Sequence, residues 1–246
     1  MIPKVIHYCW FGGNELPKLA KKCIKSWKKY CPDYEIKRWD ESNFDINTCP
    51  LYVRQAYENK KWAFVTDYIR LKLVYENGGI YLDTDVEVQK NIDEFLKYDA
   101  FFGFENGELI NTGSGFGAKT NHPIVKEIMD QYENIGFIKE DGSFDLLSCP
   151  SRNTEVFLKH GLLQNDKFQV LHEKVAILPT EYFCPIHSVT KEKNITKNTH
   201  TIHWFSGSWL PWKEQVKQNI FKCIGKIIGI KNTNKIKAKA KKVLKK

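Results

Sequence analysis

The chain has 246 residues, 42% of them apolar, and a formal net charge of +9 at pH 7. This length is enough for one large domain or two small ones, each with a buried core. The N-terminal stretch has no apolar run of signal-peptide length, no segment is apolar enough for a membrane span, and the seven cysteines include no CxxC pair. These features argue against a secreted disulfide scaffold or a zinc knuckle and favour a reducing cytoplasm.

The positive charge is concentrated at the C-terminus. Residues 213–246 contain twelve lysines and one acidic residue, Glu214, a net charge of +11 that leaves −2 for residues 1–212. Nucleic-acid-binding folds usually spread lysine and arginine over a binding face, so no nucleic-acid partner is expected for the globular part. We expect a globular domain of residues 1–212 followed by a basic tail.

Strands and helices alternate along the globular part. From apolar periodicity and turn residues, strands are expected within 3–11, 34–40, 80–86, 100–105, 114–120 and 200–209. Helices are expected within 16–30, 51–79, 122–135 and 154–161. The second helical pattern is expected to break near Lys60 and stop at Gly78, and the third to be capped by Asn121. Such alternation predicts an α/β fold with a mostly parallel sheet flanked by helices.

Acidic residues follow the predicted strand in GGIYLDTDVEV. Asp83, Asp85 and Glu87 stand two apart, so on a continuous strand they share one face. Two neighbouring carboxylates repel each other unless a cation lies beside them, and their oxygens suit Mg²⁺ or Mn²⁺ held together with a substrate's phosphates. The motif therefore predicts a metal and diphosphate site; the alternative is the solvated face of an edge strand.

An acid and a base lie on the helix that precedes this strand. Asp67 and Arg70 are three residues apart among mostly apolar neighbours, so they share one face of a largely buried helix. The alternative is a surface ion pair of little energetic value. Because the helix is expected to be buried, we interpret the pair as functional.

Together these segments resemble glycosyltransferase family 32. The similarity lies in WAFVTDYIR and GGIYLDTD, extended by IPKVIHYCWFGG and IHWFSGSW. The family includes bacterial capsule and lipopolysaccharide sugar transferases, and it is similar to yeast initiating mannosyltransferases and to the catalytic domain of clostridial glucosylating toxins. The resemblance implies a GT-A fold, a nucleotide-sugar donor, Mn²⁺ or Mg²⁺, and retention of anomeric configuration.

The resemblance also implies roles for single residues. Asp83 and Asp85 match the metal-binding DxD motif, with Asp85 the more direct ligand. Asp67 and Arg70 match the pair that holds the donor sugar and its phosphate. The remaining donor contacts that it implies are Trp10 stacking on the nucleobase, Tyr81 beside the ribose or sugar, and Asn111 near the donor sugar. Trp10 as a core residue and Asn111 as a turn former are the alternatives.

The segment HTIHWFSGSW contributes further candidates. His203 is interpreted as a third metal ligand, since neutral imidazole completes carboxylate sites. Ser206 and Ser208 offer hydroxyl and backbone donors to a diphosphate, and the Trp209 indole can donate to a phosphate oxygen. Upstream, Arg152 and Asn153 are candidates for the border of the acceptor pocket, unless Thr154 simply caps the next helix.

The interpretation favoured by the sequence is a transferase that moves a hexose, with a UDP-linked donor favoured and GDP-mannose possible, to a glycan or lipid-linked acceptor in bacterial surface polysaccharide synthesis. A DxD phosphohydrolase and a non-catalytic membrane-surface adaptor are the alternatives. In the tail, apolar residues recur at helical spacing between lysines from Val216 to Ile228, a pattern typical of a basic amphipathic helix at a membrane interface. We therefore expect a cytoplasmic enzyme, peripheral on the inner face of the plasma membrane through an anionic lipid surface; packing of Val216–Ile228 on the body is the alternative.

Overall fold

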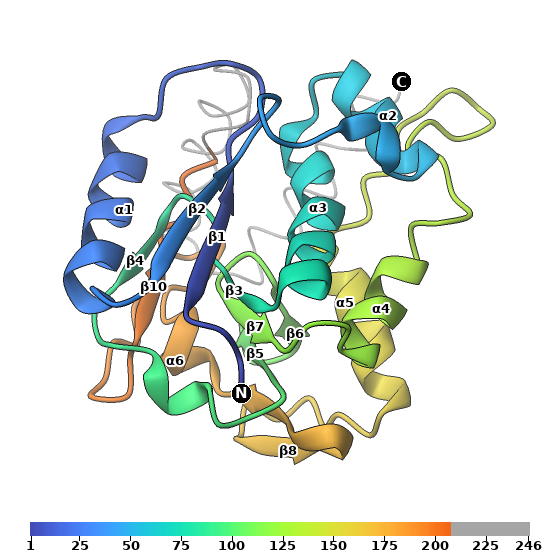
Figure 1. Cartoon of the computed structure of the whole chain (residues 1–246). Coiled ribbons are helices and arrows are strands. Elements are labelled where there is room, and N and C mark those ends of the chain that lie inside the picture. Colours follow the sequence, from blue (N-terminus) through green and yellow to red (C-terminus); the bar gives the residue numbers. More distant parts are fainter. Residues whose placement is uncertain (208–246) are drawn as a thin grey trace.

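A mixed β-sheet with helices on both faces forms the centre of the computed structural model, which describes residues 1–207 (Figure 1). The strands are β1 (Val5–Cys9), β2 (Glu35–Trp39), β3 (Gly79–Tyr81), β4 (Val86–Val88), β5 (Ala100–Glu105), β6 (Leu109–Ile110), β7 (Phe116–Ala118), β8 (Gln169–Leu171), β9 (Val175–Leu178) and β10 (Thr201–His203). The helices are α1 (Lys18–Tyr30), α2 (Leu51–Glu58), α3 (Trp62–Asn77), α4 (Pro123–Asp130), α5 (Cys149–Lys159), α6 (Thr180–Phe183) and the short 3₁₀ turns η1 (Ile46–Thr48), η2 (Asp93–Phe95) and η3 (His172–Lys174).

The strand order is β2-β1-β3-β7-β5-β9-β8, with β6 paired to β5. Neighbours β2, β1 and β3 run parallel, as do β5 and β9, whereas β7 runs antiparallel to β3 and β5. A separate two-stranded ribbon pairs β10 with β4. Because β1 and β3 are parallel, their carboxyl ends meet at one edge of the sheet, where α/β folds bind ligands.

Each face of the sheet carries its own apolar core. One core contains buried side chains of α2, α3, α4 and α5, and the other contains Trp27 of α1 with residues of β4 and α6. Trp27 is fully buried, and its indole N–H donates to the carbonyl of Val86 at 2.7 Å. Helix α1 is thereby fixed against the ribbon strand that follows Asp85.

The predicted break in the second helical pattern is confirmed. Helix α2 ends at Glu58 and α3 begins at Trp62, with Lys60 in the left-handed region at φ 54°. Gly78 ends α3 at φ 65°, as expected for a residue that needs no Cβ there. This exit directs the chain straight into β3.

Two predicted helix starts are wrong. Asn121 is not the cap of α4: it has a left-handed φ of 57°, and the Nδ1 of His122 accepts from the backbone N–H of Ile124 instead. Helix α5 begins at Cys149, capped by Ser148, so Thr154 lies inside the helix and its hydroxyl donates to the carbonyl of Pro150. A hydroxyl cap with a proline in the first turn is a good helix start, and Ser148-Cys149-Pro150 satisfies that pattern better than Thr154.

No helix within residues 1–207 is long and apolar enough to span a membrane. The expected tail, residues 213–246, and the expected domain boundary at 212 lie outside the described residues.

Candidate active site

Asp83 and Asp85 lie on a tight turn rather than on a continuous strand. Strand β3 ends at Tyr81 and β4 begins at Val86, and the backbone N–H of Val86 donates to the carbonyl of Asp83 at 2.9 Å, closing the turn. The expectation that alternation on one strand aligns the carboxylates is therefore wrong in its mechanism, although both carboxylates do reach one site. A turn brings residues two apart together as effectively as a pleat does.

Glu87 does not join the two aspartates. Its Oε2 accepts from Lys22 Nζ and from the indole Nε1 of Trp204, both at 2.9 Å. The predicted shared face of three carboxylates is thus wrong for Glu87, because β4 begins a new strand after the turn and pairs with β10.

The ribbon of β4 and β10 brings His203 to the aspartates. His203 is opposite Val86 in the register, and its Nε2 lies 3.2 Å from Asp85 Oδ1. The backbone N–H of Ser206 donates to the other oxygen of Asp85 at 2.7 Å. Asp85 is therefore held from two directions, by the last residue of β10 and by the segment that follows it.

Three side chains could hold a metal ion. Asp83, Asp85 and His203 each offer one ligand atom, and these atoms all lie within 4.8 Å of one another. The separations suit ligands placed around one ion at 2.0–2.2 Å. The Nδ1 of His203 is buried with no hydrogen-bond partner in the described part of the chain, while the side chains of Asp83 and Asp85 keep 25% and 15% of their surface exposed. The donor set fits a divalent cation that is reached from solvent.

The charges of this cluster interact strongly. Burial alone would raise the pKa of Asp85, but the neighbouring His203 and the Ser206 N–H outweigh it and hold the pKa well below its usual range. For Asp83 burial dominates, and its pKa is raised despite the nearby Arg70 guanidinium. The pKa of His203 is raised, because attraction to Asp85 outweighs the opposing effect of burial.

Helix α3 places Asp67 and Arg70 beside Asp83. Arg70 Nη2 lies 3.1 Å from Asp67 Oδ1 and 3.4 Å from Asp83 Oδ1, and both members of the α3 pair are buried. Arg70 is fixed further by its Nε, which donates to the carbonyl of Thr66 at 3.0 Å. Burial raises the pKa of Asp67 to about 6 even though Arg70 opposes the shift. A fixed cation between two carboxylates is thereby held next to the candidate metal site.

Tyr81 supports Asp83 from within the sheet. Its hydroxyl donates to Asp83 Oδ1 at 3.0 Å, and the Arg70 guanidinium lies 5.2 Å from its ring centroid. Tyr81 is 1% exposed, so it contacts Asp83 from the buried side of the site. Contact with a ribose or sugar stays a prediction.

Asn111 forms a turn against the site. Its Nδ2 donates to Glu105 Oε2 at 2.5 Å, and its Oδ1 accepts from the backbone N–H groups of Gly113 and Ser114 at 2.6 and 3.3 Å. The turn-forming alternative is therefore what the structure shows, and contact with a donor sugar stays a prediction. The turn is close to the metal candidates, since a Cβ on Gly113 would lie 2.3 Å from Asp83 Oδ2.

Trp10 follows the carboxyl end of β1. Asp83 follows the carboxyl end of the parallel strand β3, so both residues lie at the same edge of the sheet. Its indole N–H donates to the carbonyl of Asn14 at 2.6 Å, and the residue is half-buried. Stacking on a nucleobase remains a prediction. Ser208 and Trp209, predicted to contact the diphosphate, lie outside the described residues.

Arg152 and Asn153 lie in α5 and are both buried. Arg152 is paired with Asp145 and packs over the rings of Tyr52 and Tyr132. The Nδ2 of Asn153 donates to the carbonyl of Ile110 at 3.3 Å. These contacts fix both side chains within the fold, although the Nε of Arg152 and the Oδ1 of Asn153 are buried with no hydrogen-bond partner in residues 1–207. An acceptor-pocket role stays a prediction.

Sequence reasoning missed Glu105. This buried carboxylate ends β5 and orients the Asn111 amide, and through it the turn at Gly113. A signal was present, because an acidic residue closes the apolar strand AFFGFE just as Asp83 follows GGIYL. An acidic residue at the carboxyl end of an apolar strand is therefore a candidate site residue in both segments, which identifies Glu105 as well as Asp83.

Comparison with known proteins decides the class of this site. Residues 17–102 match the family described as glycosyltransferase sugar-binding region containing a DXD motif, and this segment includes Asp67, Arg70, Asp83 and Asp85. The segment that carries most of the candidate site residues therefore matches the DXD-containing glycosyltransferases. The resemblance seen in the sequence is thereby confirmed, and the phosphohydrolase and adaptor alternatives lose their support.

The chain is also similar to individual proteins. An uncharacterized glycosyltransferase of Acanthamoeba polyphaga mimivirus is 24% identical over 226 residues, covering 86% of this chain and 85% of that protein. Inositol phosphoceramide mannosyltransferase 3 of Schizosaccharomyces pombe is 31% identical over 140 residues, 55% of this chain, and the match spans only 38% of the yeast protein. Among solved structures, the PaToxG glycosyltransferase superposes with a TM-score of 0.50 at 20% identity, over 64% of this chain and 69% of that one. The structural match supports the GT-A fold.

Proposed function

We propose that this glycosyltransferase moves a hexose from a nucleotide sugar to a glycan or lipid-linked acceptor, depends on Mn²⁺ or Mg²⁺, and retains the anomeric configuration. The observation that carries the proposal is the convergence of Asp83, Asp85 and His203 within 4.8 Å, next to the buried Asp67–Arg70 pair. Carboxylates beside a fixed guanidinium suit a substrate that combines a metal-bound diphosphate with a sugar.

In this proposal Asp83, Asp85 and His203 hold the cation, which neutralises charge on the departing diphosphate when bound. Arg70 is positioned to stabilise the same developing charge from the other side of Asp83, because burial and its bond to Thr66 fix its direction. A preorganised cation in a site with little water stabilises a leaving group more than a mobile surface lysine does.

The remaining donor contacts are assigned to side chains at the same edge of the sheet. Asp67, when ionised, is an acceptor for sugar hydroxyls, and Trp10 is assigned to the nucleobase. Ser206 and, from the sequence alone, Ser208 and Trp209 are assigned to the diphosphate. Retention follows from the family resemblance, with the leaving phosphate taking the acceptor's proton.

Donor and acceptor are proposed by class. A UDP-hexose is the donor favoured from the sequence, and the names of the yeast relatives, which specify mannose transfer to inositol phosphoceramide, make GDP-mannose the first alternative to test. The same names favour a lipid-borne acceptor over a soluble one. Surface polysaccharide synthesis in a bacterium and a peripheral position at the inner membrane face rest on the sequence resemblance and the basic tail.

A thermal-shift screen of nucleotide sugars tests the donor assignment. In Mn²⁺ the matching nucleotide sugar should raise the melting temperature more than the other sugars on the same nucleotide, because a ligand that binds only the folded state stabilises it. The Trp10→Ala variant should lose the shift given by the nucleoside diphosphate alone. If no nucleotide sugar shifts the melting temperature with or without Mn²⁺, the proposed donor class is wrong.

A further inference from the structure

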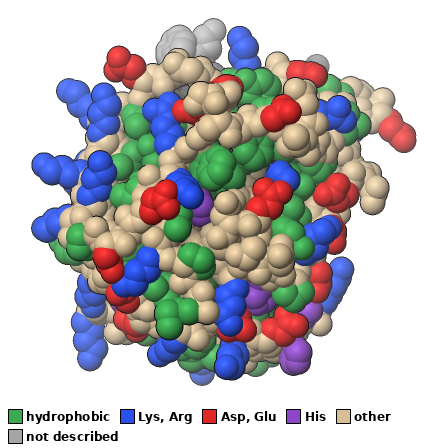
Figure 2. Space-filling view, viewed as in Figure 1, with side chains coloured by type: hydrophobic (Ala, Val, Ile, Leu, Met, Phe, Trp, Pro, Cys, Tyr) green, Lys and Arg blue, Asp and Glu red, His purple; other side chains and the backbone are tan. Residues whose placement is uncertain are grey.

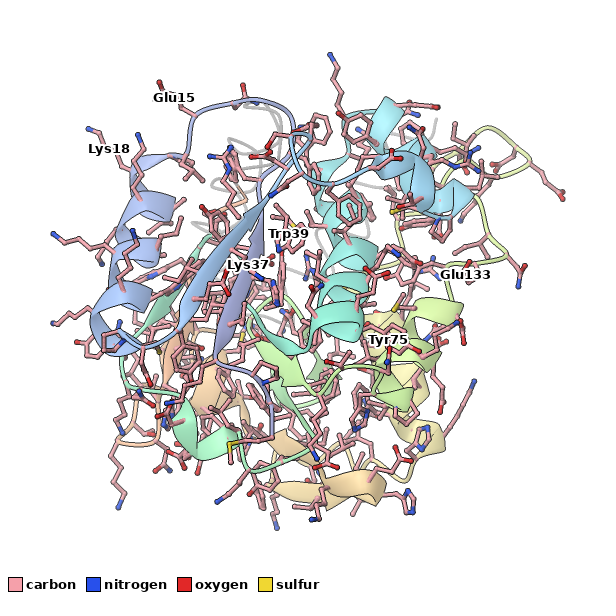
Figure 3. The ribbon with its side chains drawn as sticks, in the orientation of Figure 1. Glu15, Lys18, Lys37, Trp39, Tyr75 and Glu133 are labelled. Atoms are coloured by element: carbon pink, nitrogen blue, oxygen red, sulfur yellow. The ribbon has the colours of Figure 1, made fainter. Side chains whose placement is uncertain are left out.

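Helix α1 carries a continuous lysine surface. Its cations are spaced three or four residues apart along one side of the helix and are all exposed: Lys18, Lys21, Lys22, Lys25, Lys28 and Lys29. The buried residues Ala20, Cys23 and Trp27 occupy the opposite side. A 13-residue helix is about 20 Å long, so six charges lie along a short, straight edge of the molecule. Figure 2 shows these basic side chains gathered over α1, at the left of the view, and Figure 3 labels Lys18 at its upper end, pointing outward.

The lysine surface is segregated from the rest of the charge. Helix α1 contains no acidic residue, and residues 1–212 carry −2 in total, which leaves −8 for the part outside α1. Lys21 and Lys22 lie near Glu15 and Glu87, but Lys18, Lys25 and Lys28 have no acidic partner within residues 1–207. A patch of one sign on a body of the opposite sign creates a directed field that attracts an anionic partner.

The surface beside these lysines is hollowed. One hollow of about 470 Å³ is lined by Lys22, Lys25, Lys28 and Lys29 together with Ser26, Tyr30, Gln89 and the Glu87 carboxylate that is paired with Lys22. A second, of about 280 Å³, is lined by Lys21, Lys25 and Lys28 with Leu16 and Ile24. Lys25 and Lys28 therefore stand between two depressions that combine cations with hydroxyl, amide and apolar groups, as a phosphate-bearing amphiphile requires.

From these features we infer that the lysine surface of α1 docks on an anionic lipid bilayer. A nucleic acid suits the lysine surface less well, because the cations of α1 include no arginine. The arginine guanidinium forms paired hydrogen bonds with bases and phosphates, which lysine cannot do. Nor does α1 expose an aromatic platform for base stacking, since Trp27 is fully buried and Tyr30 is half-buried. Lysines act as point charges, which is what a fluid layer of anionic headgroups needs.

The position of α1 gives this docking a consequence for the site. Lys22 is bonded to Glu87 at 2.9 Å and Trp27 to the carbonyl of Val86 at 2.7 Å, both on the strand that directly follows Asp85. A bilayer held against α1 would thus lie beside the edge that carries the candidate metal ligands. The inference extends the proposed lipid-linked acceptor, but it depends only on the charge of α1 and can fail while sugar transfer stands.

Lysine acetylation footprinting of the full chain tests the contact directly. Phosphatidylcholine vesicles containing phosphatidylglycerol should slow acetylation of Lys25 and Lys28, whereas vesicles of phosphatidylcholine alone should not. Lys139 and Lys159, which are exposed and lie in other segments, serve as internal controls whose rates should stay unchanged. Equal acetylation of Lys25 and Lys28 with and without anionic vesicles would overturn the inference.

A charge-removal pair gives the energetic test in the same full chain. Because each lysine near an anionic surface contributes about fivefold in affinity, the Lys18→Gln, Lys25→Gln, Lys28→Gln variant should bind anionic vesicles about a hundredfold more weakly. The control removes three lysines elsewhere, Lys139→Gln, Lys159→Gln and Lys167→Gln, and should bind nearly as the wild type does. Equal losses in the two variants would mean that only net charge and the tail matter, which contradicts docking by α1.

The acetylation experiment also separates lipid from nucleic acid. If single-stranded DNA protected the α1 lysines from acetylation more strongly than vesicles at equal phosphate, a nucleic acid would be the partner and the lipid assignment would be wrong.

Discussion

At the scale of single residues, Asp85 connects the two halves of the candidate metal site. It faces His203 Nε2 at 3.2 Å and accepts the Ser206 N–H at 2.7 Å.

Asp85→Asn removes the charge that attracts both a cation and the imidazole. We expect the variant to remain folded, since a change at a partly exposed position rarely unfolds a domain, and to bind Mn²⁺ about tenfold more weakly or worse. Calorimetric titration with Mn²⁺ measures this, with Asp130→Asn on α4 as the matched control. Unchanged Mn²⁺ affinity in Asp85→Asn would show that Asp85 is not a ligand.

Asp67 predicts a pH-dependent stability. Its folded pKa is raised by burial to about 6 from an ordinary value of 3.8, so the folded state binds this proton more tightly than the unfolded chain does. The destabilising effect is absent below about pH 4, grows as pH rises, and is complete above about pH 6. Its size is on the order of 2 to 3 kcal/mol.

The Asp67→Asn variant isolates that effect. Near pH 4 its free energy of unfolding should match that of the wild type, because asparagine resembles the protonated carboxyl. Near pH 7.5 it should be the more stable protein, although we expect it to lose sugar transfer. Denaturant unfolding at the two pH values measures the difference. A variant less stable than the wild type at both pH values would mean that the ion pair with Arg70 outweighs burial.

At the scale of elements, the turn between β6 and β7 shapes the site through Gly113. A Cβ there would lie 2.3 Å from Asp83 Oδ2 and 2.7 Å from Arg70 Nη1, so Gly113→Ala must displace one of these groups. We expect Mn²⁺ and nucleotide binding to fall while the melting temperature changes little. Gly142→Ala, in a surface turn at φ 76° with no atom within 4 Å, should cost stability alone, about 1 kcal/mol. Normal Mn²⁺ binding by Gly113→Ala would show that the turn does not constrain the site.

The elements that were predictable from sequence have strong local signals. Apolar periodicity and Gly78 located α3 and its end, and the break at Lys60 followed from the polar run ENKK. Strand β9, VAIL, was missed because it is a run of only four apolar residues that is not flanked by turn residues on both sides. Such a run fits a strand and a buried helix segment equally well. The turn between β3 and β4 was read as strand because its residues alternate in polarity, and a single sequence does not show where backbone pairing stops.

At the scale of the whole molecule, the candidate site joins segments that are distant in the chain. Asp83 and Asp85 were predictable as a motif, and so was His203 as a candidate. Their approach depends on the pairing of β4 with β10, a long-range contact without a local signal. Gly113 was missed for the same reason: its importance comes from the Asp83 and Arg70 side chains that pack against it in the fold.

The basic tail gives a prediction for the whole chain. Residues 213–246 carry +11, so truncation after Trp212 should weaken binding to anionic vesicles at low salt and leave nucleotide binding unchanged. Vesicle flotation of the full and truncated chains measures this. Equal flotation of the two would remove the tail from the account of membrane binding, whereas lost nucleotide binding would place the tail within the donor site.

The most direct test of metal-dependent sugar transfer at Asp85 is turnover of the nucleotide sugar selected by the thermal-shift screen. Release of nucleoside diphosphate is followed with Mn²⁺ or with a chelator, for the wild type and for Asp85→Asn. We expect release by the wild type in Mn²⁺, loss of that release in chelator with recovery when Mn²⁺ is restored, and no release by Asp85→Asn under either condition. Equal release with and without the metal, or metal-dependent release by Asp85→Asn, would contradict metal-dependent sugar transfer through Asp85.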